Sequence, residues 1–528
     1  AMRIGRVVAN TGRDVLIIVD SHIEKRPAIR IGDIVLLQAK RDVSVGIVSG
    51  INAPAPGIES DGEELWIVQV ELVGRFEMKD GTTEFLRGAP AAPTLGSPVH
   101  LAGVSEIKLL HRHHQEDNLN YGMIQGHDGV QATIDPQGLM DGGFGILGGA
   151  GSGKSSTMAC IVRTLLRARY PVHSLLIDPY NEFSRSFGRA ANVIEPSPGL
   201  FPHWLLTFEE MVWVLSLQGG ALSEIEKTIL DEAIPIMRRS FAQRNSRAKM
   251  SPDISGDSPV PYRISDLISY IDKAASTGSE KSADALQRLR ARILEAVADP
   301  RLSIIFGNAA TSDNLSDLMV DLFRLDGGAP LSVLQLGRLA AGLDRLVVAV
   351  VSRLAAALAE WSGLKRQILI LIDNAERYAP VQVEDEVTAF SREALRMLGG
   401  RPRKLGTSLG LTAAGPRVVD LDVLLRCSTI FLHRMPSALD GEAVEEILTE
   451  PAPTFVDGLP SLRQREVMVA GRGVPLPSRV MVTELPAIAI PGARPVAALT
   501  ENALDDLEQT IERWRRYGTG EPSSKTAA

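Results

Sequence analysis

The feature that most constrains the fold of this 528-residue chain is the run Gly148-Gly149-Ala150-Gly151-Ser152-Gly153-Lys154-Ser155. It matches the phosphate-binding pattern G-x-x-x-x-G-K-[ST] at every fixed position. An apolar run, Phe144 to Leu147, precedes it and predicts a strand, and an amphipathic helical pattern follows it. A strand, a glycine-rich turn and a helix in this order predict that backbone N–H groups and the helix N-terminus hold phosphate oxygens.

The motif assigns roles to its side chains. We expect Lys154 to reach the β- and γ-phosphates of ATP and Ser155 to hold Mg²⁺. The second Mg²⁺ group is Asp373, which ends the apolar run Ile368 to Ile372 and is expected on a strand neighbouring the P-loop strand. The candidate nucleotide-binding residues are Gly148, Gly149, Gly151, Ser152, Gly153, Lys154, Ser155 and Ser156.

Short apolar runs alternate with longer helical patterns from about residue 140. Apolar runs without polar alternation are typical of parallel strands covered on both faces, so they predict an α/β domain. The expected strands are Phe144 to Leu147, Ser174 to Ile177, Leu331 to Leu336, Ile368 to Ile372, Ser408 to Thr412 and Thr429 to His433.

Three other regions show different sequence patterns. Residues 2–100 carry short strand patterns separated by Gly and Pro, which predicts a small barrel. Residues 205–300 are expected to be a helical insertion, in which Ser223 and Glu226 form a capping box. An apolar stripe from Leu504 to Trp514 predicts a terminal helix in a C-terminal extension over 486–528.

Composition restricts the class of protein. Hydrophobic residues make up 45% and no run of about 18 apolar residues occurs, which excludes a membrane-spanning helix. Two cysteines cannot form a disulfide framework, so a cytoplasmic location is the expectation. A net charge of −8 means that any contact with nucleic acid is local. One basic cluster could contact DNA phosphates, although a solvated helix end is favoured: Arg238, Arg239, Arg244, Arg247 and Lys249.

Further segments, taken in order, resemble the HerA branch of the HerA/FtsK superfamily of ring ATPases. They flank the P-loop and span residues 2 to about 485. They are Ile4-Gly5-Arg6-Val7, Ile31-Gly32-Asp33-Ile34-Val35, Arg87-Gly88, Ile177-Asp178-Pro179-Tyr180-Asn181-Glu182-Phe183, Pro202-His203-Trp204-Leu205-Leu206, the basic run at 400–406 and Gly471-Arg472-Gly473.

The resemblance implies a RecA-like P-loop ATPase core at 101–204 and 301–485, behind an N-terminal β-barrel. It implies a homo-hexamer with ATP between neighbouring subunits and double-stranded DNA in the pore. Arg401 and Arg403 then correspond to the segment that supplies a trans-acting arginine. Relatives of this kind work with a nuclease or a sirtuin-like NADase, in some cases in antiviral defence, and the barrel is the expected docking face.

The chain departs from the family pattern at two positions. The family has a glutamate after the aspartate of its acidic strand, and here that residue is Asn374. An amide can hold a water but cannot take its proton. Glu182 and Glu376 are the substitutes, and Glu182 is favoured because its strand is expected beside the P-loop strand. Ala414 stands where the family has a glutamine.

Two functions therefore remain open. The first is an ATP-driven DNA translocase that feeds a partner effector. The second is a nucleotide-stabilised hexameric scaffold with weak or no hydrolysis, which Asn374 and Ala414 favour. A conjugation-type secretion ATPase shares the P-loop, but the front barrel argues against it.

Overall fold

The computed structural model of the chain describes most of its residues. It divides into two compact units, unit 1 (Ala1–Pro171, Gly399–Arg403 and Ser408–Ile490) and unit 2 (Val172–Leu398, Lys404–Thr407 and Pro491–Ala528), and each is taken by itself. None of the helices described is long and apolar enough to cross a membrane. The described residues are 2–12, 14–20, 28–38, 42–52, 66–79, 82–88, 93–111, 119–127, 129–244, 254–277, 280–307, 312–363, 367–398, 406–435, 438–448, 453–492 and 503–516.

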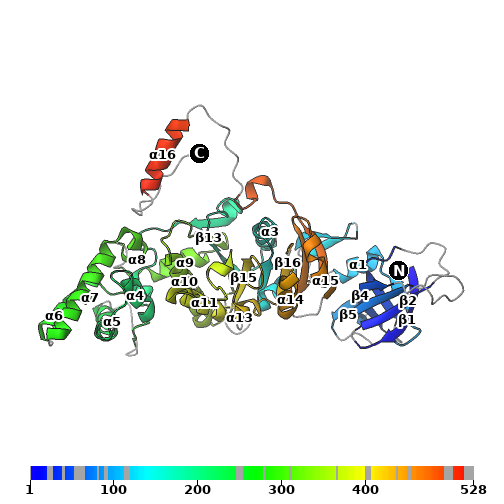
Figure 1. The fold of residues 1–528 in the computed structure, drawn as a ribbon, viewed down its shortest axis with the longest axis horizontal. Coiled ribbons are helices and arrows are strands. Elements are labelled where there is room, and N and C mark those ends of the chain that lie inside the picture. The colour runs from blue at the N-terminus through cyan, green and yellow to red at the C-terminus, as the bar shows by residue number, and fades with distance from the viewer. Residues whose placement is uncertain are drawn as a thin grey trace. The chain divides into compact units, whose positions relative to one another are not determined.

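Unit 1 begins with the predicted barrel (Figure 1). Six antiparallel strands follow the order β2-β1-β7-β3-β4-β5, and pairing of β2 with β5 closes the ring, while β6 extends β5 as a hairpin. The strands are β1 (Met2–Asn10), β2 (Asp14–Val19), β3 (Ile34–Gln38), β4 (Val43–Asn52), β5 (Ile67–Lys79), β6 (Thr82–Arg87) and β7 (Pro98–Leu101).

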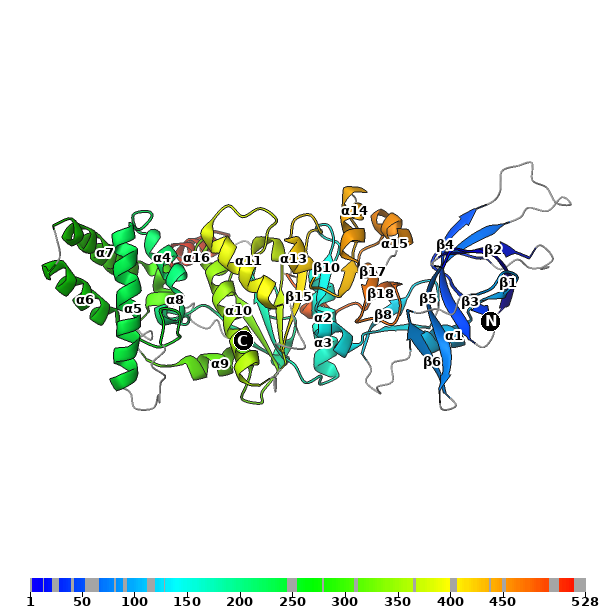
Figure 2. The ribbon, with the colours of Figure 1, turned by 90° about the horizontal axis from the view of Figure 1, so that it is seen from below.

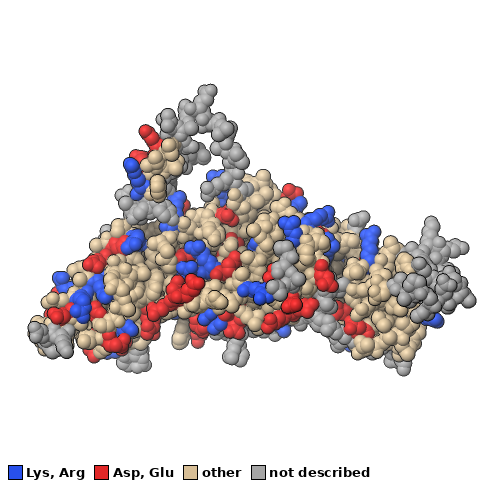
Figure 3. Space-filling view, viewed as in Figure 1, with Lys and Arg blue, Asp and Glu red and all other residues tan. Residues whose placement is uncertain are grey.

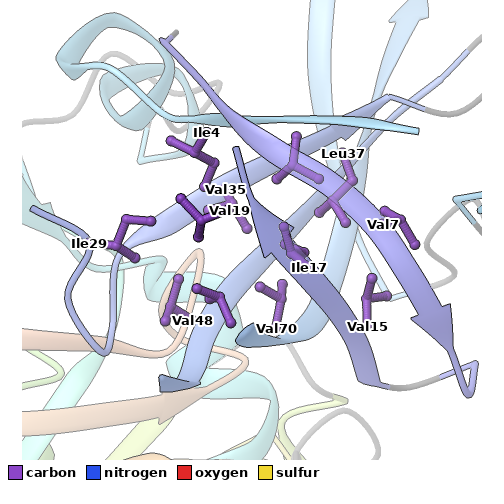
Figure 4. Close-up of a cluster of buried hydrophobic side chains, with 12 residues drawn as sticks. Ile4, Val7, Val15, Ile17, Val19, Ile29, Val35, Leu37, Val48 and Val70 are labelled. Atoms are coloured by element: carbon purple, nitrogen blue, oxygen red, sulfur yellow. The ribbon is translucent and has the colours of Figure 1, made fainter. Parts of the chain in front are cut away.

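Aliphatic side chains fill the inside of the barrel (Figure 4). In β2 the buried residues alternate with half-buried ones, as expected for a strand with one face towards a core. Val15, Ile17 and Val19 point inwards and meet Ile4 and Val70.

The rest of unit 1 carries the P-loop strand. Strand β10 pairs in parallel with β15 and β16, and the sheet continues through the antiparallel strands β17, β18, β8 and β9. The strands are β8 (Asn120–Ile124), β9 (Gln131–Thr133), β10 (Phe144–Leu147), β15 (Thr407–Ala413), β16 (Thr429–Leu432), β17 (Glu466–Gly471) and β18 (Ser478–Val482). The helices are α1 (Val104–Leu110), α2 (Pro136–Gly142), α3 (Lys154–Arg167), α13 (Leu421–Leu424), α14 (Ala438–Ile447), α15 (Pro453–Gly458) and the short η6 (Leu459–Ser461) and η7 (Ala487–Ala489).

Unit 2 holds a second set of parallel strands in the order β12-β13-β11-β14. Every residue of β13 and β14 is buried, which explains their uninterrupted apolar sequences. The strands are β11 (His173–Asp178), β12 (Ala191–Ile194), β13 (Leu331–Gln335) and β14 (Ile368–Ile372). The helices of unit 2 outside the helical insertion include α9 (Leu315–Phe323), α10 (Leu343–Trp361), α11 (Glu386–Leu398), α16 (Ala503–Arg516), η1 (Gly188–Ala190), η2 (His203–Leu205) and η5 (Ala375–Arg377).

The helical insertion lies in unit 2, where α5, α6 and α7 pack on one another (Figure 2). The predicted capping box is confirmed, because Ser223 N donates to Glu226 Oε2 (2.7 Å) and Glu226 N donates to Ser223 Oγ (3.4 Å). The helices are α4 (Phe208–Ser216), α5 (Glu224–Arg244), α6 (Ile264–Thr277), α7 (Glu280–Ala298), η3 (Pro300–Leu302) and α8 (Ser303–Phe306).

The expectation for the basic cluster is wrong at Arg238, which is neither solvated nor available to DNA. Its side chain is 1% exposed, donates from Nη2 to Leu206 O (3.1 Å) and lies over the ring of Tyr262. The face of α5 that carries Arg238 packs against the turn at 203–206. The periodicity of the sequence alone did not reveal this burial. Arg247 and Lys249 lie outside the described residues.

Candidate nucleotide-binding site

The P-loop forms the predicted turn between β10 and α3 in unit 1. Gly148, Gly151 and Gly153 have φ of 159°, 68° and 106°. Glycine is needed at Gly151 and Gly153 because these values lie in the left-handed region that other residues avoid. Gly153 caps α3 in this conformation, so Lys154 and Ser155 are the first residues of the helix. The loop therefore places the free N–H groups of a 14-residue helix at the motif.

Three backbone hydrogen bonds hold the loop to the neighbouring strands. Gly148 N donates to Ala413 O (3.1 Å), at the end of β15. Gly149 N donates to Arg434 O (3.0 Å), just after β16, and Arg465 N donates to Ser152 O (3.3 Å). Both sides of the loop are thus fixed by main-chain contacts before any ligand binds.

The buried side chain of His433 packs against the P-loop and the first turn of α3. It is 0% exposed, its Nε2 lies 3.0 Å from Thr157 Oγ1, and a Cβ on Gly148 would stand 2.5 Å from the His433 Cβ. Burial lowers the pKa of His433 to about 3, helped by the positive charge of Lys154. The imidazole is therefore neutral at physiological pH, and Gly148 is the residue small enough to lie against it.

The neutral state of His433 predicts a pH dependence of stability. The imidazole titrates near 6.5 in the unfolded chain and near 3 in the folded one, so the unfolded state binds the proton more tightly. Stability should fall as the pH drops below about 6.5, by about 1.4 kcal/mol per pH unit from this group. His433→Asn, which keeps a hydrogen-bonding group but does not titrate, should flatten the pH dependence of the free energy of unfolding. An unchanged slope would contradict the assignment.

The side chains of the motif lie at the loop as predicted. Lys154 Nζ donates to Gly149 O (3.0 Å). Lys154, Ser155 and Ser156 are partly exposed, whereas Ser152 is buried inside the loop, with 2% of its surface exposed. The Ser152 hydroxyl makes no hydrogen bond within the described part of the chain, and its role in nucleotide binding stays a prediction.

In unit 2, Asp178 at the end of β11 organises the turn that carries Glu182. The carboxylate is fully buried and accepts hydrogen bonds from Glu182 N (3.0 Å) and Phe183 N (2.8 Å). Burial raises the pKa of Asp178, although these backbone hydrogen bonds oppose the shift. Glu182 O accepts from Gly492 N (3.1 Å), and a Cβ on Gly492 would stand 3.1 Å from Glu182 Oε1. The Gly492 backbone therefore lies beside the Glu182 carboxylate.

The turn after β14 carries the second acidic set. Asp373 is 1% exposed, and its N–H donates to Ile177 O (3.3 Å) on β11. Asn374 adopts a left-handed conformation (φ 55°, ψ 59°), which asparagine tolerates better than most residues. Its Nδ2 lies 3.5 Å from Glu376 Oε1, while Glu376 Oε2 is buried and makes no hydrogen bond within the described part of the chain.

An ion pair fixes this turn to its surroundings in unit 2. Arg377 Nε donates to Asp344 Oδ2 (2.5 Å), and Asp344 is 2% exposed at the start of α10. The Arg377 guanidinium also lies 5.9 Å from the ring centroid of Tyr180, on the turn after β11. Both candidate carboxylates, Glu182 and Glu376, are thus placed on turns that pack together at the ends of paired parallel strands.

The strand positions expected for Asp373 and Glu182 are wrong in one respect. Strand β10 pairs with β15 and β16, whereas β11 pairs with β13 and β14, so neither β11 nor β14 directly neighbours the P-loop strand. Strand order depends on long-range pairing, which the local apolar pattern does not report. Ala414 does follow β15, the strand beside the P-loop, and is exposed. Arg401 and Arg403 lie outside the described residues.

His433, Arg434 and Arg465 contact the P-loop and were not singled out by sequence. The sequence offered one signal for two of these residues, because the pair His433-Arg434 directly follows a buried apolar strand. That strand, β16, is a parallel neighbour of the P-loop strand, and the pair lies where it ends. Arg465 gave no signal, because its left-handed φ of 63° and its approach to Ser152 come from tertiary packing.

Comparison with known proteins places these features in a family context. Residues 119–355 match the model of the family described as "Helicase HerA, central domain". The "DNA double-strand break repair helicase HerA" of Sulfolobus acidocaldarius is 20% identical over 86% of this chain and 88% of its own. The "Probable DNA double-strand break repair helicase HerA" of Methanocaldococcus jannaschii is 22% identical over 87% of this chain and 92% of its own.

Among solved structures, VirB4 of Thermoanaerobacter pseudethanolicus superposes with a TM-score of 0.50 at 17% identity. The match covers 71% of this chain and 98% of that one. At this identity the likeness concerns the fold, and it agrees with the predicted RecA-like P-loop core.

Proposed function

This chain is a HerA-like ATPase of the HerA/FtsK superfamily, and on that premise we propose that it binds ATP at the P-loop and hydrolyses it to move double-stranded DNA. The observation that carries the proposal is the complete phosphate loop. It has left-handed glycines at Gly151 and Gly153, a strand on one side and the open N-terminus of α3 on the other. Backbone donors and Lys154 then receive the phosphates.

The side chains proposed for Mg²⁺ have the required chemistry. Ser155 offers a hydroxyl oxygen in the first turn of α3, and Asp373 offers a carboxylate, and such hard oxygen ligands suit this ion. The described residues contain no cluster of three or more His, Cys, Asp or Glu side chains that could hold a metal ion. Bound Mg²⁺ would neutralise charge on the phosphates, while Ser155 and Asp373 would orient it.

Assembly into a homo-hexamer and passage of DNA through a pore are part of the proposal. The relative's printed name, a DNA double-strand break repair helicase, supports a role on DNA. The basic segment with Arg401 and Arg403 supports a ring, because a guanidinium from a neighbour could complete the site. On the face seen in Figure 3, basic and acidic side chains are interspersed. DNA contacts should therefore be few per subunit and add up around a ring.

The second candidate function is a nucleotide-stabilised ring that assembles and gates an effector. Asn374 and Ala414 favour it, because neither can do what the family's glutamate and glutamine do. In both versions we propose that the partner is a nuclease or a sirtuin-like NADase that docks on the barrel, and that the pair acts in antiviral defence. Exposed apolar side chains on the barrel support docking there, notably Met78 (79% exposed) and Leu95 (70%).

The test combines assembly with turnover. The purified full chain should give species of six chains by mass photometry, and phosphate release should rise when duplex DNA is added. Rings that bind ATP but release no phosphate, with or without DNA, would support the scaffold instead. A protein that stays monomeric with ATP and Mg²⁺ would remove the ring and its trans-acting arginine.

A further inference from the structure

Two basic residues of unit 1 form hydrogen bonds with Gly149 of the P-loop, Arg434 through its backbone carbonyl and Lys154 through its side chain. The N–H of Gly149 donates to Arg434 O (3.0 Å), and the Gly149 carbonyl accepts from Lys154 Nζ (3.0 Å). The backbone of Arg434 therefore lies at the part of the loop where the ammonium of Lys154 sits. Lys154 is the group expected at the β- and γ-phosphates, so this is the distal-phosphate side of the loop.

The backbone of Arg434 is fixed while its side chain is exposed. The flanking residues are buried, His433 at 0% and Met435 at 1% exposure, and His433 N donates to Leu147 O (2.8 Å) on the P-loop strand. Because the Arg434 backbone is already fixed next to the loop, its long side chain can reach a ligand there with little further loss of backbone conformational entropy.

Among the described residues, Arg434 has no acidic partner, unlike three other arginines of unit 1. Arg465 pairs with Glu484 (3.3 Å), and Arg463 and Arg479 both pair with Glu466. Within the described part of the chain, no hydrogen bond or ion pair engages the guanidinium of Arg434. A cation held beside a phosphate cradle without a carboxylate is a group suited to an anion.

The surroundings of the loop are already positive. Lys154 Nζ lies at Gly149 O (3.0 Å), and burial together with the positive charge of Lys154 lowers the pKa of the neighbouring His433. Helix α3 adds the positive end of its dipole at the same place. A second cation here raises the free energy of the ligand-free loop and is offset when an anion binds.

We propose that the guanidinium of Arg434 contacts the distal phosphates of the nucleotide, as a second cationic ligand supplied by the same subunit as the P-loop. The inference rests on the proposed binding of ATP at this loop and adds a residue to it. Because Arg434 belongs to the P-loop's own subunit, its effect on binding should not need the neighbour that Arg401 and Arg403 would serve.

The experiment measures ATPγS and ADP affinity of the full-length protein by calorimetry at two ionic strengths. Arg434→Gln should weaken ATPγS binding roughly 10- to 100-fold, the size of a lost charge-assisted hydrogen bond, and ADP binding less. Arg434→Lys should recover part of the loss, because it keeps the charge. The salt dependence of binding should be shallower in Arg434→Gln than in the parent.

Arg472→Gln is the matched control. Arg472 is also an exposed arginine of unit 1, and its N–H donates to Ser428 O (3.2 Å). It follows Gly471, which pairs with Thr429 at the opposite end of β16 from Arg434. Its replacement should leave both affinities unchanged.

The outcomes separate the inference from the function on which it rests. Equal affinities for the parent and Arg434→Gln, in a parent that binds ATPγS, would show a solvent-facing arginine and overturn the inference alone. Equal losses for ATPγS and ADP would show that the guanidinium does not contact the γ-phosphate, which ADP lacks, and would overturn the inference as well. A parent that binds neither nucleotide would overturn the proposed function first.

Discussion

Lys154→Ala should abolish measurable ATP binding while the protein stays folded. The substitution removes the ammonium that lies on Gly149 O at the mouth of the loop and leaves the glycine turn and α3 in place. Loss of a charge-assisted contact to the β- and γ-phosphates should weaken ATP binding roughly 100-fold or more. Calorimetry with ATP and Mg²⁺ measures the change, and circular dichroism checks the fold.

The control for Lys154→Ala lies on the same helix. Arg167 ends α3 and its Nη2 donates to Thr164 Oγ1 (3.0 Å), so Arg167→Ala removes one positive charge at the far end of the helix. It should leave ATP affinity unchanged. A folded Lys154→Ala protein with the affinity of the parent would mean that the loop does not hold the nucleotide's phosphates.

The sequence predicted those parts of the fold that local patterns encode. The strands at Phe144–Leu147 and Ile368–Ile372 are uninterrupted apolar runs because both faces of the sheet are covered, and all of their residues are buried. The P-loop followed from fixed spacing, and the capping box at Ser223 from side-chain chemistry.

Local sequence patterns did not predict the strand order or the contacts between distant parts of the chain. The order of strands puts β15 and β16 beside the P-loop, and this arises from pairings across hundreds of residues. The contacts of His433 and Arg434 with the loop follow from that order, so they could not be placed before it was known. Arginine is usually a surface residue, and the burial of Arg238 depends on the turn at 203–206, which packs over it.

The structure also changes the argument for a proton acceptor. The sequence favours Glu182 because its strand is expected beside the P-loop strand, but β11 pairs with β13 and β14 instead. The turn that carries Glu182 is held by Asp178 and by the backbone of Gly492. Glu376 lies two residues after Asn374, close to its amide, with one buried carboxylate oxygen that no described residue bonds. We therefore expect Glu376 to contribute more than Glu182 to any hydrolysis.

Asn374→Glu should raise the steady-state rate of phosphate release, by roughly 10- to 100-fold, if the rest of the site is competent. It restores a carboxylate at the position where the family carries one, and a positioned general base is typically worth a factor of 10² or more. The gain is limited by the left-handed backbone at Asn374, where glutamate costs about 1 kcal/mol more than asparagine. Melting temperatures of the two proteins measure that cost separately from the rate.

Companion variants identify the acceptor in the parent protein. Glu376→Gln should lower the slow parental rate strongly and Glu182→Gln weakly, with ATP affinity kept in both, because neither residue belongs to the phosphate loop. In hydrolysis the water oxygen bonds to the γ-phosphorus, the bond to the bridging oxygen of ADP breaks, and the water proton passes to the acceptor carboxylate. If Asn374→Glu and the parent both release phosphate no faster than Lys154→Ala, the ring binds ATP without turnover and the scaffold function replaces the translocase.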